Sequence, residues 1–169
     1  MDFKVNSSDL LKAISHIHGV VEIRHTLPIL SNMIITAKDG FLKLCSTNLD
    51  IYCSDQVNAE IFSPGEISVS ASTFHEIIKR LPNGSDLHAT LDEESSCLML
   101  KCGRSKFNLT TMKTEDFPII ADTDLNTNFV LSAAELIRMI DKTKFAISNE
   151  ETRYYLNGVF FHKTQKNSI

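Results

Sequence analysis

The sequence predicts an α+β protein in which helices lie on one face of antiparallel β-sheets, and a pattern that occurs three times predicts it. Each copy is a short strand of alternating apolar residues, a small polar residue and then an amphipathic helix. The copies begin at Phe3, Ile67 and Phe129, at nearly equal spacings of roughly 60 residues. Two rounds of strand, helix and three strands predict one pseudo-twofold domain, and the third copy begins a second domain.

The first copy contains clear helix boundary signals. Ser7 and Ser8 are good N-cap residue types, and Gly19 is a stop signal after a helix that runs to about His18. The Asp-Gly pair that ends at Gly40 indicates a hairpin between two apolar runs. The strands expected after the helix cover residues 30–36, 41–47 and 51–62.

The second copy repeats this order. Its strand covers residues 67–71, Ser72 is expected to cap the helix, and the helix ends before Pro82. The three strands expected next cover residues 88–92, 97–102 and 106–112. Residues 1–120 are therefore expected to form one complete domain.

A polar stretch then interrupts the pattern, and residues 121–128 are expected to form a linker. Beyond it, Ser132 and Glu135 have the spacing of a capping box, and a helix is expected to run to about Phe145. A strand is expected at residues 154–162. By comparison with the first two copies, residues 129–169 are expected to form the truncated opening half of a second domain.

The composition is that of a globular protein of ordinary charge. Of the 169 residues, 43% are hydrophobic and 22% are charged, and the formal net charge is −4. Bulk charge therefore gives no sign of nucleic-acid binding. The chain shows no signal peptide, no apolar run near the about 18 residues of a membrane helix, and four cysteines expected to be reduced. We expect a cytoplasmic protein without membrane association.

Motifs of catalysis and of metal binding are not apparent in the sequence. It contains no Gly-rich phosphate loop, no Gly-x-Ser-x-Gly motif, no Cys-x-x-Cys pair and no His cluster with zinc-ligand spacing. The six histidines fall on unrelated predicted elements. We expect a binding protein that is not an enzyme and that holds no cofactor or metal.

The predicted helices carry basic residues on the side opposite their apolar face. A helical wheel that advances about 100° per residue places Lys12 and His16 on this side of the first helix. The positions that match His16 hold Arg80 in the second helix and Lys142 in the third. Those that match Lys12 hold Glu76 and Arg138. Because the helices sum to a positive charge while the rest of the chain is acidic, this side is suited to the phosphates of duplex DNA, without sequence readout. An ordinary solvated helix surface is the alternative.

Four motifs resemble those of a known family. They are TLPILSN at residues 26–32, GRSKF at 103–107, DFP at 116–118 and RYYLNG at 153–158. With these motifs, and in order over residues 1–161, the chain resembles the N-terminal part of the bacterial sliding clamp, the beta subunit of DNA polymerase III.

The resemblance implies a DNA-clamp (processivity) fold. In this family a subunit contains three copies of one domain, and two subunits join head to tail as a homodimeric ring whose helices line the hole. The ring encircles double-stranded DNA, tethers the replicative polymerase, is placed by a clamp loader and catalyses no reaction. A chain of this length is expected to form no ring alone and to give no processivity alone. The alternative is a protein-interaction module without DNA encirclement.

The resemblance also implies DNA contacts, position by position. Arg24, Glu150, Tyr154 and Tyr155 fall where the family touches DNA, and Ser72 falls where a basic residue can occur. Glu150 stands where a neutral polar residue is typical of the family. Because strand residues alternate between faces, only one of the two tyrosines is expected to face DNA. A loop cation without a DNA contact is the alternative for Arg24.

Further residues match the family's protein contacts. Arg104, Lys106, Phe107 and Leu109 match the subunit interface, and Leu156 matches a wall of the pocket that takes the polymerase's peptide motif. Phe107 and Leu109 lie two residues apart and so share one strand face. The alternative is that both face the core while the two cations are solvated.

Overall fold

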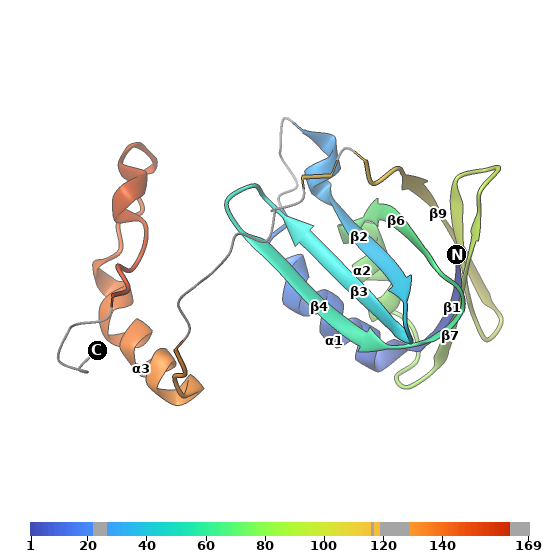
Figure 1. The fold of residues 1–169 in the computed structure, drawn as a ribbon, viewed down its shortest axis with the longest axis horizontal. Helices are drawn as coiled ribbons and strands as arrows, with labels where there is room; N and C mark the ends of the chain where they lie inside the picture. The colour runs from blue at the N-terminus through green and yellow to red at the C-terminus, as the bar shows by residue number, and fades with distance from the viewer. Residues whose placement is uncertain (22–26, 116, 119–128, 163–169) are drawn as a thin grey trace. The chain divides into compact units, whose positions relative to one another are not determined.

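The computed structural model describes residues 1–21, 27–115, 117–118 and 129–162. The chain divides into two compact units, Met1–Ala121 and Asp122–Ile169. Figure 1 shows strands and helices in the first unit and helical segments in the second.

The first unit combines antiparallel strands with helices. Its strands are β1 (Asp2–Asn6), β2 (Asn32–Lys38), β3 (Phe41–Thr47), β4 (Tyr52–Asn58), β5 (Glu60–Ser63), β6 (Gly65–Ser70), β7 (Asp86–Asp92), β8 (Cys97–Cys102) and β9 (Ser105–Met112). Its helices are α1 (Ser7–His18), the 3-10 helix η1 (Pro28–Ser31) and α2 (Ala71–Lys79). The sequence pattern did not indicate η1.

The strands form two antiparallel sheets with the same internal order. One sheet runs β4-β3-β2-β6-β9 and the other β9-β8-β7-β1-β5, with β9 paired in both. Strands at the same place in the two orders are β3 and β8, β2 and β7, and β6 and β1. Each of these pairs joins a strand of the first sequence copy to the matching strand of the second copy. The predicted pseudo-twofold α+β architecture is therefore confirmed (Figure 1).

The prediction of one strand over residues 51–62 is wrong, because the chain changes sheet at Ala59. β4 pairs with β3, whereas β5 pairs with β1 in the other sheet. Between them the Ala59 amide donates to the Gly40 carbonyl at 2.9 Å. An alternating pattern indicates which face of a strand is buried, but it does not identify the neighbouring strand. The change of sheet at Ala59 therefore could not be predicted from the alternation of apolar and polar residues.

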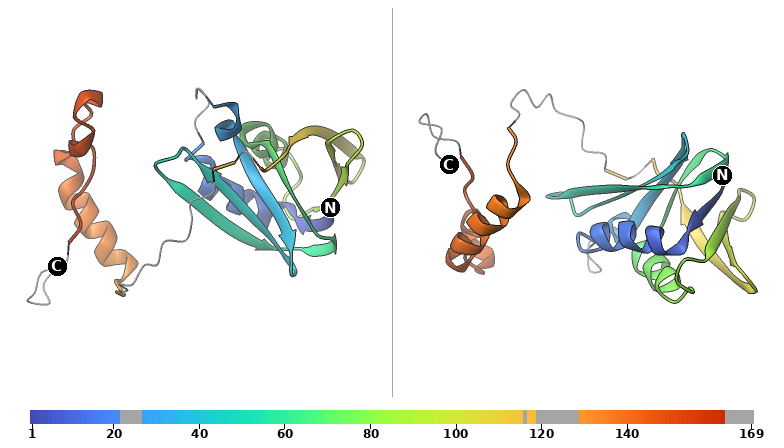
Figure 2. Two further views of the ribbon diagram at one scale, coloured as in Figure 1. Left: turned by 45° about the horizontal axis from the view of Figure 1, so that its top comes forward. Right: turned by 90° about the horizontal axis from the view of Figure 1, so that it is seen from below.

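Helices α1 and α2 cover one face of the strand layer (Figure 2), and their apolar stripes form the core. Leu10, Ile14 and Ile17 of α1 and Phe74 of α2 are fully buried, and Ile78 of α2 is 1% exposed. The opposite side of each helix is left to solvent. Among the described residues no helix is long and apolar enough to cross a bilayer.

The N-cap of α1 is Asn6 and not the predicted Ser7 or Ser8. The Asn6 side-chain oxygen accepts hydrogen bonds from the Ser8 and Asp9 amides at 3.0 and 3.4 Å. The buried Ser7 hydroxyl instead donates to the Pro82 carbonyl at 2.9 Å. A contact distant in sequence thus uses the side chain that local rules assigned to the cap.

The N-cap of α2 is likewise displaced, from the predicted Ser72 to Ser70. The Ser70 hydroxyl accepts a hydrogen bond from the Thr73 amide at 3.4 Å. Both serines are suitable cap residues. The end of β6 decides between them, because the helix begins directly after that strand.

The second unit contains α3 (Ala133–Thr143) and the 3-10 helices η2 (Lys144–Ala146) and η3 (Glu151–Leu156). Ser132 caps α3 as predicted, since its hydroxyl oxygen accepts a hydrogen bond from the Glu135 amide at 3.2 Å. The Ser132 hydroxyl also donates to the Glu135 carboxylate at 2.9 Å.

The strands predicted in this unit, at Phe129 and over residues 154–162, are wrong. Residues 129–132 have no regular structure, and Glu151–Leu156 forms 3-10 turns that are interrupted by a kink at Arg153, where φ is −117° and ψ is 52°. A strand needs a neighbouring strand to satisfy its backbone hydrogen bonds. The described residues 129–162 contain no strand that could be that neighbour.

Candidate nucleic-acid interface

The solvent side of α1 and α2 carries basic residues, among them Lys12 and Arg80, which the helical wheel placed there. Lys12, Lys79 and Arg80 are exposed. Lys12 lies 3.8 Å from the Asp9 carboxylate, and Arg80 lies 3.5 Å from that of Glu76. Exposed pairs of this kind contribute only about 0–1 kcal/mol. A phosphate group can therefore replace the carboxylate at little cost.

His16 does not provide a free cation on this side. Its Nδ1 lies 2.6 Å from the Asp55 carboxylate of β4. The hydrogen bond from His16 lowers the pKa of Asp55 below its ordinary value, and the charge of His16 acts in the same direction. The wheel predicted the exposure of His16 correctly, but the Asp55 carboxylate compensates its charge. Lys12 is therefore the available cation of α1.

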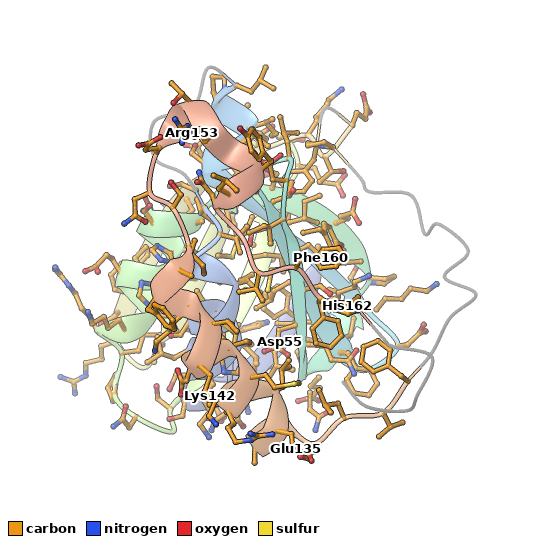
Figure 3. All side chains as sticks on the ribbon, turned by 90° about the vertical axis from the view of Figure 1, so that its left-hand side faces the viewer. Asp55, Glu135, Lys142, Arg153, Phe160 and His162 are labelled. Carbon is orange, nitrogen blue, oxygen red and sulfur yellow. The ribbon has the colours of Figure 1, made fainter. Side chains whose placement is uncertain are left out.

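A second set of exposed cations lies on α3. Arg138 and Lys142 are one turn apart, both exposed, and neither forms an ion pair with a described residue. Lys144, at the end of the helix, is paired with Asp141 at 2.7 Å. Figure 3 shows Lys142 on α3, with Glu135 at the start of the helix. The helix therefore offers two cations on one side.

Ser72 lies half-buried in the first turn of α2. It lines an open groove between α2 and β9, together with Glu76, Arg80 and Phe107. A DNA contact by Ser72 stays a prediction.

The remaining predicted DNA contacts are Arg24, Glu150, Tyr154 and Tyr155. Arg24 and the side chain of Tyr154 lie outside the described residues. Tyr155 is 71% exposed, and Glu150 lies 3.2 Å from Arg153 in an exposed ion pair (Figure 3 labels Arg153). Because Glu151–Leu156 consists of kinked 3-10 turns and is not a strand, strand alternation does not apply to the two tyrosines. Their role stays a prediction.

The first part of β9 is a free sheet edge. β9 pairs with β8 along Ser105–Thr110, but with β6 only at Thr111 and Met112. Within the described residues, the second edge of β9 therefore has no partner over Ser105–Thr110. A free edge of this kind is a template for a strand of another chain.

The residues predicted for the subunit interface lie along this edge and in the turn before it. Arg104 and Lys106 are exposed and Phe107 is half-buried. Leu109 is only 4% exposed and belongs to the core cluster. Leu109 is therefore core-facing, as the alternative has it. Phe107 packs against the same core cluster but stays partly exposed, so it supplies the apolar surface at the edge.

One contact that sequence reasoning missed joins α1 to α2. The ring centroids of His18 and His75 lie 4.6 Å apart, with ring planes tilted by 33°. On the helical wheel each histidine lies about 90° from the apolar stripe of its own helix. This position on the wheel indicates a contact between the two histidines only when the two helices are known to pack together.

Metal-ligand clusters are not formed by the described residues, which contain no group of three or more His, Cys, Asp or Glu able to hold an ion. The four cysteines are free thiols. Tyr52 donates a hydrogen bond to the sulfur of the buried Cys45 at 2.9 Å, and burial raises the pKa of this thiol.

Two family models match the chain in succession. The N-terminal domain of the DNA polymerase III beta subunit matches residues 1–121, and its central domain matches residues 130–169. The chain belongs to the beta sliding clamp family. The resemblance inferred from the motifs is confirmed. Sliding clamps are non-catalytic processivity factors, so the family also confirms the expectation of a protein that is not an enzyme.

Relatives and solved structures agree with this family. The beta sliding clamp of Caulobacter vibrioides is 42% identical over 162 residues, which cover 96% of this chain and 44% of that protein. That of Rickettsia bellii is 38% identical over 158 residues, 94% of this chain and 41% of that protein. The crystal structure of the DNA polymerase sliding clamp from Caulobacter crescentus has a TM-score of 0.89 at 42% identity, covering 94% of this chain and 43% of that one.

A clamp from Bartonella birtlesii bound to griselimycin gives a TM-score of 0.92 at 38% identity, covering 98% of this chain and 44% of that one. The chain thus spans less than half the length of these relatives. The clamp fold predicted for it is confirmed by both structures.

Proposed function

We propose that the chain acts within a sliding clamp that encircles duplex DNA without sequence specificity and tethers the replicative DNA polymerase for processive synthesis. The exposed cations Lys12, Lys79 and Arg80 carry this proposal, because they lie on one side of a helix pair whose other side is the core. Contacts from such side chains to phosphate do not depend on base sequence. Encirclement keeps a weakly bound protein on DNA while it slides.

Further DNA contacts belong to the same proposal. They are Arg138 and Lys142 of α3, which are exposed, and Arg24, Ser72, Glu150, Tyr154 and Tyr155, which rest on the family resemblance. Glu150 would repel phosphate by its charge, and its ion pair with Arg153 reduces that repulsion.

A head-to-tail homodimer is the proposed assembly. The free edge of β9 supports it, because its backbone groups can pair with a strand of a second subunit. Phe107 adds apolar surface there, while Arg104 and Lys106 can attract acidic residues of the partner. Leu109 supports the edge from the core side.

Contacts with the replication machinery complete the proposal. Leu156, which is 45% exposed, would form one wall of the pocket for the polymerase's peptide motif, and a clamp loader would place the ring on DNA in the bacterial cytoplasm. Residues 1–120 would be the first clamp domain, 121–128 the linker and 129–169 the opening half of the second domain.

A protein-interaction module without DNA encirclement is the second candidate. The exposed apolar residues of the second unit favour it. Phe129 is 59% exposed, Phe145 is 85% exposed and Phe160 is 86% exposed. An exposed apolar surface of this kind is typical of a region that packs against other protein.

The test is equilibrium binding of the 169-residue chain to a fluorescent duplex of about 30 base pairs at several salt concentrations. The double variant Lys79→Glu with Arg80→Glu removes two proposed phosphate contacts. We expect it to bind about tenfold more weakly and to lower the slope of log K against log salt by about 2. Duplexes of different sequence should bind equally.

The matched control is the double variant Lys43→Glu with Lys101→Glu, which changes the net charge equally. Both lysines are exposed, on β3 and β8. This control should retain most of the affinity. If the two double variants lose affinity equally, DNA does not meet the helix side and the proposed interface is wrong.

A further inference from the structure

His18 and His75 meet where α1 and α2 pack side by side. His18 is the last residue of α1, and His75 lies in the middle of α2. Their ring centroids lie 4.6 Å apart with a tilt of 33°, and both side chains are half-buried. The two imidazoles therefore touch each other while remaining partly accessible to solvent.

This pair differs from two other histidines of the unit. His16 lies 2.6 Å from the Asp55 carboxylate, and His88 lies 2.7 Å from that of Asp2. Each of these rings already has an anion as its partner. Neither His18 nor His75 forms an ion pair with a carboxylate of the described residues.

The surroundings of His75 disfavour its protonation. Burial lowers the pKa of His75, the His18 charge and the Lys79 charge lower it further, and the Glu76 carboxylate opposes them. Glu76 also lies 3.5 Å from the Arg80 guanidinium, which shares its negative charge. Protonation of His75 is therefore disfavoured, and the permanent cation Lys79 lies on the next turn of α2.

We propose that the His18–His75 pair is a contact site for the phosphate backbone of duplex DNA, and that it takes up a proton when the phosphate binds. The proposal rests on the proposed function, in which the α1–α2 side meets DNA. A phosphodiester carries a permanent negative charge, and its oxygens accept hydrogen bonds from imidazole N–H groups. Its charge offsets the repulsion that Lys79 exerts on a proton at His75.

Proton uptake makes DNA affinity depend on pH. Binding of an anion that raises the pKa of a histidine must strengthen as the pH falls, by at most about tenfold per pH unit for one proton. We expect the dissociation constant to fall by about threefold from pH 7.5 to 6.0 at constant ionic strength. Lys79 keeps its charge over this range, so it contributes to affinity but not to this dependence.

The experiment compares the 169-residue chain with the variants His18→Gln and His75→Gln at both pH values, using the same 30-base-pair duplex. His88→Gln is the control, because His88 lies on β7 beside Asp2. We expect the two pair variants to lose the threefold dependence and the control to keep it. Circular dichroism verifies that each variant is folded.

A second measurement needs no variant. The Cε1–H signals of the histidines are titrated by NMR with and without duplex, and with inorganic phosphate at the same phosphate concentration. DNA should raise the pKa of His75, and inorganic phosphate should have a much smaller effect. An equal effect of inorganic phosphate would overturn the assignment to the DNA backbone.

The outcomes separate this site from the proposed function. If the pair variants keep the pH dependence while Lys79→Glu with Arg80→Glu still weakens binding, the histidine site is wrong and the DNA-facing side stands. If the charge variants bind as the unaltered chain does at both pH values, the proposed function fails, and the histidine site fails with it.

Discussion

Asp55 holds His16 by a hydrogen bond of 2.6 Å, and this contact shows how one partner changes the role of a residue. The lowered pKa of Asp55 means that the ionised carboxylate is favoured in the folded state. Its contribution to stability is therefore present above the ordinary value of 3.8 and is lost as the pH falls through the lowered pKa. At neutral pH the contact joins α1 to β4, and His16 is withdrawn from phosphate binding.

The two serines at the start of α2 give a prediction at the residue scale. Ser70→Ala should lower the free energy of unfolding by about 1 kcal/mol, because it removes the N-cap that accepts the Thr73 amide. Ser72→Ala, two residues later, should change it by less than about 0.5 kcal/mol. Urea denaturation followed by circular dichroism measures both. A larger loss for Ser72→Ala would mean that the helix begins where the sequence rule placed it.

At the scale of elements, the same sequence pattern produces two separate strands in the first copy and one continuous strand in the second. β4 and β5 separate at Ala59 and join different sheets, whereas their counterpart β9 serves both sheets as one strand. Because β9 turns to β6 only at its end, its first part keeps a free edge. The position of the proposed subunit interface follows from this difference.

The two apolar residues of β9 give a prediction at this scale. Leu109→Ala should destabilise the first unit by about 3 kcal/mol, because Leu109 is buried in the core and its loss leaves a cavity. Phe107→Ala should cost less, since Phe107 is partly exposed at the free edge. Chemical denaturation of both variants tests the order. A larger loss of stability for Phe107→Ala would mean that Phe107, and not Leu109, contributes more to the core.

At the scale of the whole molecule, the two units differ in how much apolar surface they bury. The first unit has one large core cluster that both helices and both sheets share. In the second, α3 has no buried residue, and Leu136, Ile137 and Ile140 are 38%, 59% and 42% exposed. Packing of an apolar face supplies most of the stability of a helix in a protein, so α3 has little of its own.

Hydrogen exchange should therefore separate the two units. Amides of β2, β3 and the buried half of α1 should be protected by the global stability of the first unit, and amides of α3 should exchange orders of magnitude faster. Mass spectrometry of peptides at several protein concentrations measures this. Protection of α3 equal to that of α1 at all concentrations would contradict the prediction. Protection that rises with concentration would show that another copy covers α3.

Much of the fold could be predicted because it depends on neighbours in sequence. The period of apolar residues located α1, α2 and α3 to within about two residues, and Ser132 was identified as a cap from the residue three positions later. The exposed side of each helix followed from the same period, and so did the candidate cations Lys12, Arg80, Arg138 and Lys142.

The sequence by itself thus determined the repeated strand–helix units, their buried and exposed faces and, through its motifs, the family. Only the tertiary structure decided that the strand after β3 divides at Ala59, that Asn6 and Ser70 cap the helices, that Asp55 compensates His16 and that His18 meets His75. Periodicity and local capping act between residues a few positions apart. Each of these contacts depends instead on which strand or helix packs beside it, and that choice is made by the whole core.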